Sequence, residues 1–294
     1  MERAGRDRRW VFAGAGNMAS SIVGGLIASG TSSQGLLLID PGETVRMRAG
    51  ERFGTPTAAS LGEARRQHAT FFDDGHDLGV VLAVKPNIVE SVCRELVDEH
   101  LADRCAIVSI AAGVRVAAIE QWLGGSAPIV RCMPNTPSLI GLGASGLYAN
   151  GSVEPALMAQ TRRLFEAVGD VVELDREAQI DAVTAVSGSG PAYFFRLVEL
   201  MEEAGASLGL DADIARRLAI RTCEGAAAMM VDGDDSPAAL RIKVTSPNGT
   251  TAAALDRFAD DDLAGLVQRA MHAAHDRAVE LGDDFLPPST VTRS

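Results

Sequence analysis

The sequence predicts an α/β protein in which an N-terminal domain built on a parallel sheet is followed by an all-α domain. In the first half of the chain, short apolar runs alternate with amphipathic stretches, as expected for parallel strands joined by crossover helices. Strand-like runs stop near Leu174, and only helical spacing follows. A chain of 294 residues is also long enough for two domains of roughly 150 residues each. We therefore expect domains at 1–174 and 175–294.

The elements of the first domain follow from periodicity. Runs rich in β-branched and apolar residues predict strands at 9–13, 36–40, 80–84, 106–110, 129–133, 144–148 and 171–174. Amphipathic spacing predicts helices at 18–28, 88–99, 116–123 and 155–167.

The second domain is expected to contain helices alone. They are predicted at 182–186, 192–208, 213–231, 237–244, 251–258 and 263–281, with glycine and proline between them. Helices with broad apolar faces and no sheet to cover often pack against a second subunit. A homodimer is the expected assembly.

Composition restricts the class of partner. With 27 Lys plus Arg against 39 Asp plus Glu, the net charge is −12, which argues against nucleic acid or an anionic membrane as the main partner. No run approaches the ~18 apolar residues of a membrane span. The charged start, 1–9, contains no apolar signal core. We expect a cytoplasmic protein that acts on a small molecule.

Cysteine and lysine are both scarce. The cysteines at 93, 105, 132 and 223 form no CxxC pair, so buried reduced thiols are expected rather than disulfides. Lys85 and Lys243 are the only lysines among the 27 basic residues. In a chain that otherwise uses arginine, these two positions are candidates for a specific role.

A glycine motif follows the first predicted strand. Residues 10–19 read as a strand, then Gly14-Ala15-Gly16-Asn17-Met18-Ala19, a GxGxxA pattern that opens a helix. In this context Gly14 permits a tight turn, Gly16 allows a pyrophosphate to approach the backbone, and Ala19 keeps helix and strand close. A dinucleotide site is the favoured interpretation, and a glycine-rich turn without a ligand is the alternative.

The end of the second predicted strand bears on cofactor choice. Asp40 stands about 20 residues after the motif, where a carboxylate accepts hydrogen bonds from the adenosine ribose and repels a 2′-phosphate. Arg46 and Arg48 could reach such a phosphate, although a solvated helix face explains them more simply. NADH and NADPH both remain candidates.

Further candidate residues follow other predicted strands. Lys85-Pro86 ends the 80–84 strand and can line the cofactor, with a structural ion pair of Lys85 as the alternative. The small residues of 109–113 suit a ring passing close by, or a tightly packed turn. Asn135, in a loop bracketed by two prolines, could be held rigidly beside a nicotinamide.

Two helix starts in the second half contain exposed hydroxyls. Segments 187–193 and 245–251 each combine Ser or Thr with Gly and Pro. Such starts are ordinary N-caps or, through free N–H groups and hydroxyls, carboxylate-binding sites. His272 and His275 are not accompanied by further ligands, so no metal is expected. No covalent-catalysis signature is present, which suggests that a cofactor supplies the chemistry.

Taken in order, six blocks resemble the pyrroline-5-carboxylate reductase family. They are 12–19, 83–86, 109–113, 131–137, 181–193 and 244–251. The resemblance implies a Rossmann-type domain followed by a helical dimerisation domain that completes the active site at the subunit interface. It also implies homodimers, often assembled into decamers. The implied reaction, the last step of proline biosynthesis, is reduction of L-1-pyrroline-5-carboxylate to L-proline by NADPH or NADH.

The resemblance also assigns residues. The implied cofactor-binding positions are Gly14, Ala15, Gly16, Asn17, Met18, Ala19, Ala83, Val84, Lys85, Pro86, Ala111, Ala112 and Lys243. The implied substrate-binding positions are Glu177, Ser246, Gly249, Thr250 and Thr251. Thr251 is the implied catalytic residue, orienting the ring nitrogen while the loop before it holds the carboxylate.

Three features depart from the family pattern. Asn248 stands where a glycine is usual, and asparagine tolerates the left-handed backbone that such a loop needs. Asp40-Pro41-Gly42 replaces a loop that usually carries Ser or Asn, and often Arg, for the 2′-phosphate. The stretch 62–78 is longer than expected, so the family's asparagine near the cofactor has no clear counterpart; Ser60 is the nearest candidate.

Other functions fit parts of the pattern. β-Hydroxyacid dehydrogenases pair similar domains but use a helix lysine, and only Lys243 is available in the helical half. An imine reductase for another cyclic imine is a closer alternative. A non-catalytic nucleotide-binding paralogue is conceivable because of Asn248.

Overall fold

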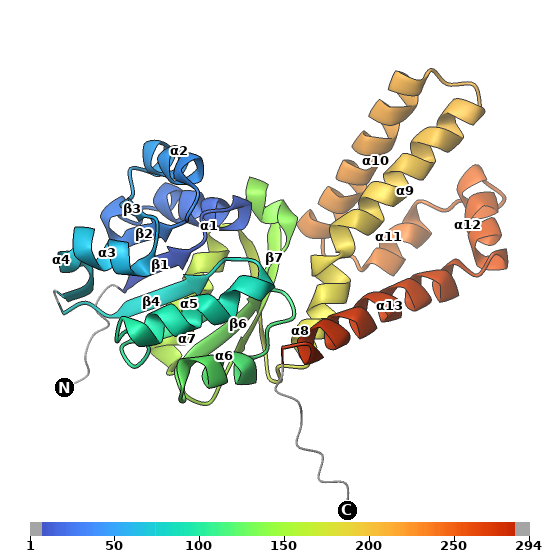
Figure 1. Ribbon diagram of the computed structural model, residues 1–294. Coiled ribbons are helices and arrows are strands. Elements are labelled where there is room, and N and C mark those ends of the chain that lie inside the picture. The colour runs from blue at the N-terminus through green and yellow to red at the C-terminus, as the bar shows by residue number, and fades with distance from the viewer. Residues whose placement is uncertain (1–7, 74, 286–294) are drawn as a thin grey trace, which may run out of the picture. The chain divides into compact units, whose positions relative to one another are not determined.

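The computed structural model describes residues 8–73 and 75–285 (Figure 1). The chain forms two compact units, which we call the sheet unit, Met1–Gly188 with Ala274–Ser294, and the helical unit, Ser189–Ala273. Most of the charged N-terminal start lies outside the described residues. The predicted boundary at residue 174 matches the end of the last strand, whereas the compact sheet unit continues to Gly188 and includes the end of the C-terminal helix.

An eight-stranded sheet organises the sheet unit. Its strands are β1 Arg9–Ala13, β2 Leu36–Ile39, β3 Thr57–Ala58, β4 Leu78–Leu82, β5 Cys105–Ser109, β6 Ile129–Met133, β7 Gly143–Ala149 and β8 Gly169–Leu174. The spatial order is β3-β2-β1-β4-β5-β6-β7-β8. Strand order reverses between β1 and β4, the switch point at which doubly wound sheets bind ligands. The predicted α/β class is confirmed.

The expectation of an all-parallel sheet is wrong at one pairing, so that β7 and β8 both run opposite to the other six strands. β7 pairs with β6 in the antiparallel direction, and β8 then pairs parallel to β7. The connection between β6 and β7 contains only the short 3-10 helix η2 (Thr136–Ile140), which cannot form a crossover. The helix α7 (Pro155–Glu166) provides the crossover that makes β8 parallel.

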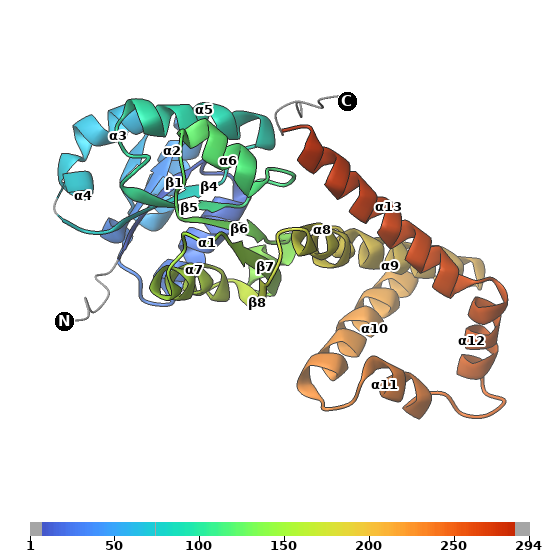
Figure 2. The same cartoon turned by 90° about the horizontal axis from the view of Figure 1, so that it is seen from below.

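Helices cover both faces of the sheet (Figure 2). The face packed by α1 (Asn17–Ala28), α2 (Glu43–Phe53) and α7 carries one buried cluster. The opposite face is packed by α3 (Leu61–Gln67), α4 (Ala69–Asp73), α5 (Pro86–Asp98) and α6 (Val116–Leu123). A short 3-10 turn, η1 (Ser33–Gly35), precedes β2. Side chains alternate between the faces: Trp10 and Phe12 join the first cluster, and Val11 and Ala13 the second.

Both ends of β4 differ from the sequence prediction, and side-chain packing explains why. β4 begins at Leu78 and ends at Leu82, two residues before the predicted 80–84 strand. Gly79 lies inside this strand because a Cβ there would stand 2.4 Å from the Trp10 ring. A strand glycine that makes room for an indole could not be distinguished from a turn glycine in the sequence. The helices α3 and α4 and the two-residue β3 were not predicted.

The segment that links the units is helical throughout. α8 (Gln179–Val183) runs into a π-helical turn, η3 (Thr184–Gly188), and α9 (Gly190–Ser207) begins with Pro191 in its first turn. The gap predicted between the helices at 182–186 and 192–208 therefore consists of the end of this π-helical turn, Ser189 and the first turn of α9. Pro191 occupies the position predicted for it, where the missing N–H costs no hydrogen bond.

The helical unit consists of helices whose side chains are mostly exposed to solvent. They are α9, α10 (Ala212–Asp232), α11 (Pro237–Lys243), α12 (Thr250–Asp260) and the first part of α13 (Leu263–Asp283). α9 and α10 approach closely because Gly205 has no side chain: a Cβ there would lie 3.1 Å from Ala215 Cβ. Between residues 189 and 273, all of which the structure describes, only Gly190, Ala215 and Ala219 are buried.

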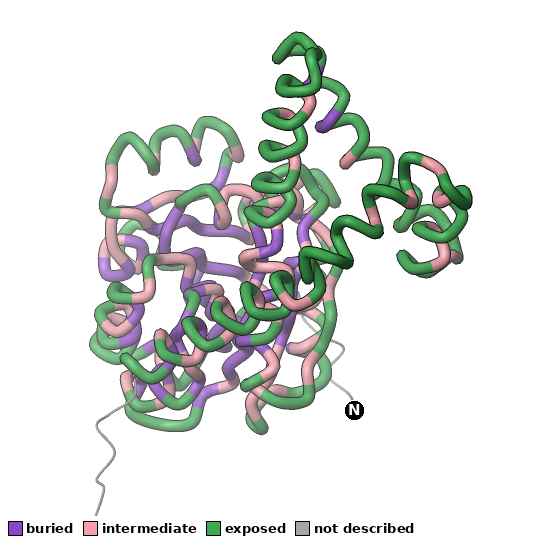
Figure 3. The backbone as a smooth tube through the Cα atoms, turned by 90° about the vertical axis from the view of Figure 1, so that its right-hand side faces the viewer, coloured by how far each residue is buried: buried purple, intermediate pink, exposed green. Residues whose placement is uncertain are grey.

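Figure 3 shows this contrast as burial in the strands and exposure along the helices α9 to α12. Large apolar side chains that remain exposed in the helical unit include Phe194, Phe195, Leu197, Leu208, Leu218, Met229, Val231, Ile242, Val244 and Leu266. No described helix is long and apolar enough to cross a membrane.

Candidate active site

The glycine loop lies at the switch point of the sheet. Gly14 has φ +100°, and a Cβ there would stand 2.6 Å from the Ala83 carbonyl oxygen, so no other residue fits without moving the backbone. Its amide donates to the Ile39 carbonyl at 2.7 Å, and the Ala83 amide donates to the Ala13 carbonyl at 2.8 Å. These bonds join the ends of β1, β2 and β4 into one rigid turn.

The start of α1 is open toward ligand. A Cβ on Gly16 would meet no atom within 4 Å, and no side chain caps the first-turn amides of α1. By contrast, Ser60 Oγ accepts from Glu63 N at the start of α3. Uncapped helix amides beside an unobstructed glycine fit a pyrophosphate, because the helix dipole and free donors both favour an anion. Buried Ala15 and Ala19 and half-buried Met18 lie behind this surface, while Asn17 is exposed.

Asp40 ties the glycine loop to the loop after β2. Its Oδ2 accepts from Ala15 N at 3.1 Å, and its Oδ1 accepts from Gly42 N at 2.9 Å. An ionised carboxylate has about four acceptor sites. The remaining ones are open to ribose hydroxyls, so the predicted contact and this structural role are compatible.

Two arginines of α2, Arg46 and Arg48, make different contacts. Arg46 Nη1 donates to the carbonyls of Asp40 and Pro41, both at 2.8 Å, and so stabilises the loop itself. Arg48 lines a groove of about 690 Å³ along α1, together with Gly16 and Asn17. Arg48 is therefore the better candidate for contact with an anionic group near the start of α1.

The loop after β4 holds the other predicted cofactor residues. Since β4 ends at Leu82, Ala83 and Val84 are half-buried loop residues rather than strand residues. Exposed Lys85 is the N-cap of α5, without a side-chain cap, and Pro86 begins the helix. The structure gives Lys85 no ion pair, so the structural alternative for it gains no support among the described residues.

Asn135 is engaged within the protein. Its Nδ2 donates to the Ser187 carbonyl at 3.0 Å, and its Oδ1 accepts from Ala144 N at 2.9 Å. The side chain, only 9% exposed, joins the end of β6 to β7 and to the π-helical turn. Each end of the amide makes one bond within the protein, so the loop holds Asn135 in a fixed position. Contact of Asn135 with a cofactor stays a prediction.

Glu177 is likewise occupied. Its Oε1 accepts from Val116 N at 2.8 Å and from Arg131 Nη1 at 3.0 Å. Arg131 Nη2 lies 3.6 Å from Asp181 Oδ1. In this structure Glu177 Oε1 therefore binds a backbone amide and an arginine. Contact of this carboxylate with substrate stays a prediction.

The substrate loop of the helical unit has an unusual backbone. Asn248 has φ +60°, the left-handed conformation that asparagine was predicted to tolerate. Gly249 N donates to the Ser246 carbonyl at 3.1 Å, and a Cβ on Gly249 would lie 2.6 Å from Ser246 Oγ. Gly249 is the N-cap of α12 without a side-chain cap, so the first-turn amides and the exposed Thr250 and Thr251 hydroxyls are available.

Lys243 lies at the end of α11 in the same unit. Its Nζ forms an ion pair with Asp235 Oδ2 at 2.5 Å, and the lysine side chain is 62% exposed. An exposed pair of this kind contributes little to stability. Contact of Lys243 with a cofactor stays a prediction.

Sequence reasoning missed the buried charges behind the β5–α6 loop. Arg131 and Asp181 are only 3% and 4% exposed, yet neither was singled out. A signal existed, because Arg131 interrupts the apolar run of β6. The partners could not be predicted, since they come from segments far away in the sequence.

Fold and site together define a class. A doubly wound sheet with an uncapped glycine loop at its switch point is the architecture of dinucleotide-binding oxidoreductase domains. Residues 9–113 match a family model described as NADP oxidoreductase, coenzyme F420-dependent. Residues 177–281 match the model for pyrroline-5-carboxylate reductase dimerisation.

Whole-chain relatives agree. A pyrroline-5-carboxylate reductase of Pseudomonas aeruginosa is 46% identical over 277 residues, covering 94% of this chain and 98% of the relative. One from Corynebacterium melassecola is 36% identical, covering 92% and 97%. The chain belongs to the pyrroline-5-carboxylate reductase family.

Solved structures give the same result. That of a pyrroline-5-carboxylate reductase from Coxiella burnetii superposes with a TM-score of 0.85 at 39% identity, covering 93% of this chain and 98% of the other. A Plasmodium falciparum pyrroline carboxylate reductase with NADP bound gives 0.77 at 26% identity, covering 95% and 100%.

Proposed function

We propose that this protein reduces L-1-pyrroline-5-carboxylate to L-proline with NADPH or NADH, the last step of proline biosynthesis. The proposal rests on the similarity to pyrroline-5-carboxylate reductases along almost the whole chain. The starts of α1 and α12, which carry the two binding motifs, also have no side-chain cap. One uncapped start follows the glycine loop and the other follows Asn248.

The sheet unit binds the cofactor in this proposal. Gly14 and Gly16 admit the pyrophosphate to the start of α1, and Asp40 accepts from the adenosine ribose. Ala83, Ala111 and the residues beside them form the nicotinamide side. When bound, NAD(P)H supplies the hydride that reduces the C5–nitrogen double bond of the substrate.

The helical unit binds the substrate. A carboxylate accepts from the amides at the start of α12 and from the Ser246 and Thr250 hydroxyls, which suits the free donors found there. The Thr251 hydroxyl orients the ring nitrogen. Because a protonated imine accepts hydride readily, the protein needs to hold the ring in place rather than supply a strong acid.

The assembly belongs to the same proposal. A dimerisation domain with exposed apolar helix faces fits a homodimer whose helices cover one another. The proposal includes further assembly of these dimers into a decamer. The cytoplasm is the proposed location.

Direct assay tests the activity. Oxidation of NADH and NADPH is followed with racemic pyrroline-5-carboxylate and, separately, with other cyclic imines. Turnover on pyrroline-5-carboxylate is expected, and better turnover on another cyclic imine would favour the imine reductase alternative. Binding of NAD(P)H without turnover on any imine would favour the non-catalytic alternative.

The same assay compares the two cofactors. Asp40 carries negative charge where a 2′-phosphate would lie, so NADH is expected to be used at least as well as NADPH. A strong preference for NADPH would contradict the proposed role of Asp40.

The Thr251→Ala substitution tests the site. It removes a hydroxyl proposed to contact the reacting ring, so kcat is expected to fall by about a hundredfold while the Kd for NAD(P)H stays within about twofold. Thr251→Ser keeps the hydroxyl and is the matched control, expected to retain most activity. Unchanged turnover in Thr251→Ala would overturn the assignment.

A further inference from the structure

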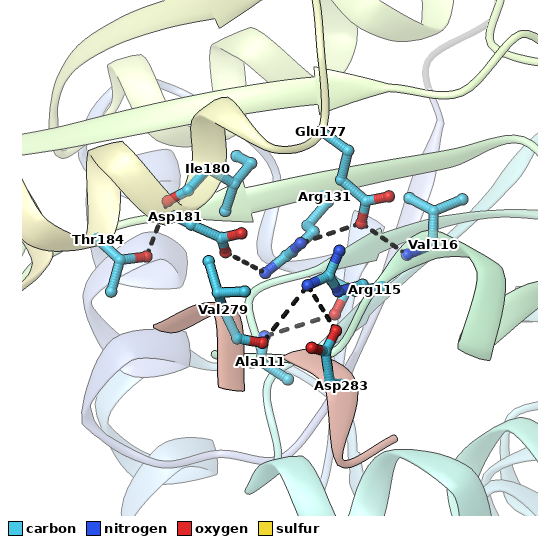
Figure 4. Close-up of polar contacts among 11 residues, drawn as sticks. Ala111, Arg115, Val116, Arg131, Glu177, Ile180, Asp181, Thr184, Val279 and Asp283 are labelled. Carbon is cyan, nitrogen blue, oxygen red and sulfur yellow. Dashed lines mark hydrogen bonds and ion pairs between the residues drawn. The ribbon is translucent and has the colours of Figure 1, made fainter. Parts of the chain in front are cut away.

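A buried charge network lies behind the loop that joins β5 to α6 (Figure 4). Glu177, from the turn after β8, accepts from Val116 N at 2.8 Å and from Arg131 Nη1 at 3.0 Å. Arg131, on β6, reaches Asp181 of α8 with its second nitrogen at 3.6 Å. One carboxylate therefore holds the first residue of α6 and is itself held by a buried arginine.

Burial makes this arrangement rigid. The side chains of Arg131 and Asp181 are 3% and 4% exposed, and that of Glu177 is 24% exposed. Breaking a buried pair by removing one partner leaves an uncompensated charge, which is strongly unfavourable. Glu177 Oε1 is consequently held between Val116 N and the Arg131 guanidinium.

The other side of the loop is held by the end of α13. Arg115, the N-cap of α6, donates from Nη2 to Asp283 Oδ1 at 2.9 Å and to the Val279 carbonyl at 3.4 Å. Gly282 provides the space for this guanidinium, since a Cβ there would lie 2.6 Å from Arg115 Nε. These α13 residues belong to the sheet unit.

Gly113 brings the β5–α6 loop against α13. It has φ +76°, and a Cβ at this position would lie 3.0 Å from Leu281 Cβ. The loop therefore packs against α13 at a point where only glycine fits both the backbone and the space.

The loop has little internal support. Its hydrogen bonds are long: Val114 N donates to the Ala111 carbonyl at 3.4 Å, and Ala111 N donates to Ser109 Oγ at 3.4 Å. No side chain of its own caps α6. Its position is therefore set by the shorter bonds that Val116 and Arg115, at its C-terminal end, make to Glu177 and Asp283 in distant parts of the sequence.

We propose that Glu177 and Arg115 are positioning residues that fix the nicotinamide-side loop, Ala111–Gly113, from its two sides. The proposal rests on the proposed function, in which this loop lines the nicotinamide. Glu177 acts on the reaction through Val116 and the loop, without contact with substrate. Loosening either anchor is expected to weaken the fit of the nicotinamide half of the cofactor and to spare the adenosine half, which is bound at the glycine loop.

Glu177→Gln and Arg115→Gln test this inference. Glu177→Gln keeps an oxygen that can accept from Val116 N but removes the charge that pairs with Arg131. The Kd values of NADH and of ADP-ribose, which lacks the nicotinamide, are measured for each variant by fluorescence titration and competition. NADH binding is expected to weaken by about tenfold with ADP-ribose binding unchanged, and kcat to fall by about ten- to a hundredfold.

Glu173→Gln is the matched control. Glu173 is an exposed glutamate of β8 that pairs with Arg162, away from the loop, so this variant should bind both ligands as wild type does. Equal weakening of NADH and ADP-ribose in the Glu177 and Arg115 variants would show a general structural role and overturn the proposal. Wild-type values for both ligands would also overturn it.

The two proposals fail in different ways. Absence of turnover on pyrroline-5-carboxylate in the wild-type protein would refute the proposed function, yet the ratio of NADH to ADP-ribose affinity would still be measurable. Thermal unfolding of each variant shows whether it folds. If Glu177→Gln fails to fold, Arg115→Gln, whose side chain is 25% exposed, provides the same comparison.

Discussion

The sheet unit and the helical unit differ in how far a single chain completes them. In the sheet unit, β1, β2, β4 and β5 are buried along nearly their full length, and helices cover both faces. In the helical unit, Phe195 is 69% exposed and Leu208 is 86% exposed. The first unit has a core of its own, whereas the second presents apolar faces that fit a partner.

The difference explains why the two units carry different kinds of site. The glycine loop is built from the ends of neighbouring strands in one chain and is rigid without a partner. The loop before α12 projects from helices that have few buried contacts. We therefore expect one chain to form the proposed cofactor site and the proposed substrate site to depend on assembly.

The strongest test charges the apolar faces of the helical unit. Phe195→Asp combined with Leu218→Asp, both at exposed positions of α9 and α10, places charges where a dimer would bury apolar surface. Each lost side chain costs roughly 1.5–3 kcal/mol of burial, and each buried charge adds more. The protein is expected to become monomeric by light scattering and to lose turnover, while the sheet unit still binds NADH.

Arg221→Gln, an exposed position of α10 that pairs with Glu224, is the control and should stay dimeric. A double variant that remains dimeric and active would show that these faces are not the interface.

The next largest effect is expected at Gly14. Gly14→Val forces a Cβ to within 2.6 Å of the Ala83 carbonyl at a residue with φ +100°. The glycine loop must shift, so NADH affinity is expected to fall by about a hundredfold, equivalent to ~3 kcal/mol. The Kd is measured by NADH fluorescence.

Gly35→Ala is the comparison for Gly14→Val. A Cβ at Gly35 meets no atom within 4 Å, so its NADH affinity should match wild type. If Gly14→Val binds NADH as tightly as wild type does, the glycine loop is not part of the cofactor site.

A pH effect is expected in the sheet unit alone. Burial raises the pKa of Cys93 and Cys105 to about 12 from an ordinary value of 9.0, and it raises the pKa of Cys132 as well. The folded state therefore resists ionisation that the unfolded chain undergoes. Stability is intact below about pH 9, and the free energy of unfolding falls as pH rises toward 12. At about pH 10.5 the loss is about 2 kcal/mol for each of Cys93 and Cys105.

Urea unfolding at about pH 8 and about pH 10.5 measures this loss. A Cys93→Ala, Cys105→Ala, Cys132→Ala variant should show a flatter pH dependence than wild type. Cys223→Ala, at a half-buried cysteine of the helical unit, is the matched control. Equal slopes for all three proteins would contradict the prediction.

The smallest expected effect concerns Asn248. Its φ of +60° is costly for most residues, so Asn248→Ala should destabilise the substrate loop by roughly 1–2 kcal/mol and raise KM by about tenfold. Asn248→Gly should keep KM within about twofold, because glycine adopts the same backbone freely. A lower KM in Asn248→Gly would instead show that the asparagine side chain crowds the carboxylate.

Much of the fold could be predicted because it depends on local patterns. The strands β1 and β6 and the helix α6 lie where periodicity placed them, and the left-handed backbone of Asn248 agrees with its residue type. The antiparallel direction of β7 and the position of β4 were not predicted. The position of β4 depends on the Trp10 ring, which is distant in the sequence, and the direction of β7 on a connection after β6 that contains no crossover helix.

The candidate site also has features set by local sequence and features set by tertiary structure. The residue types and spacing at Gly14, Asp40 and Asn248 determined by themselves a dinucleotide loop, its acidic neighbour and a left-handed turn, because each meets a local backbone requirement. Only the tertiary structure decided which distant segments Glu177 and Asn135 hydrogen-bond within the protein. The physical reason is that a side chain's hydrogen-bond partners depend on which distant segments the fold brings within about 3 Å of it.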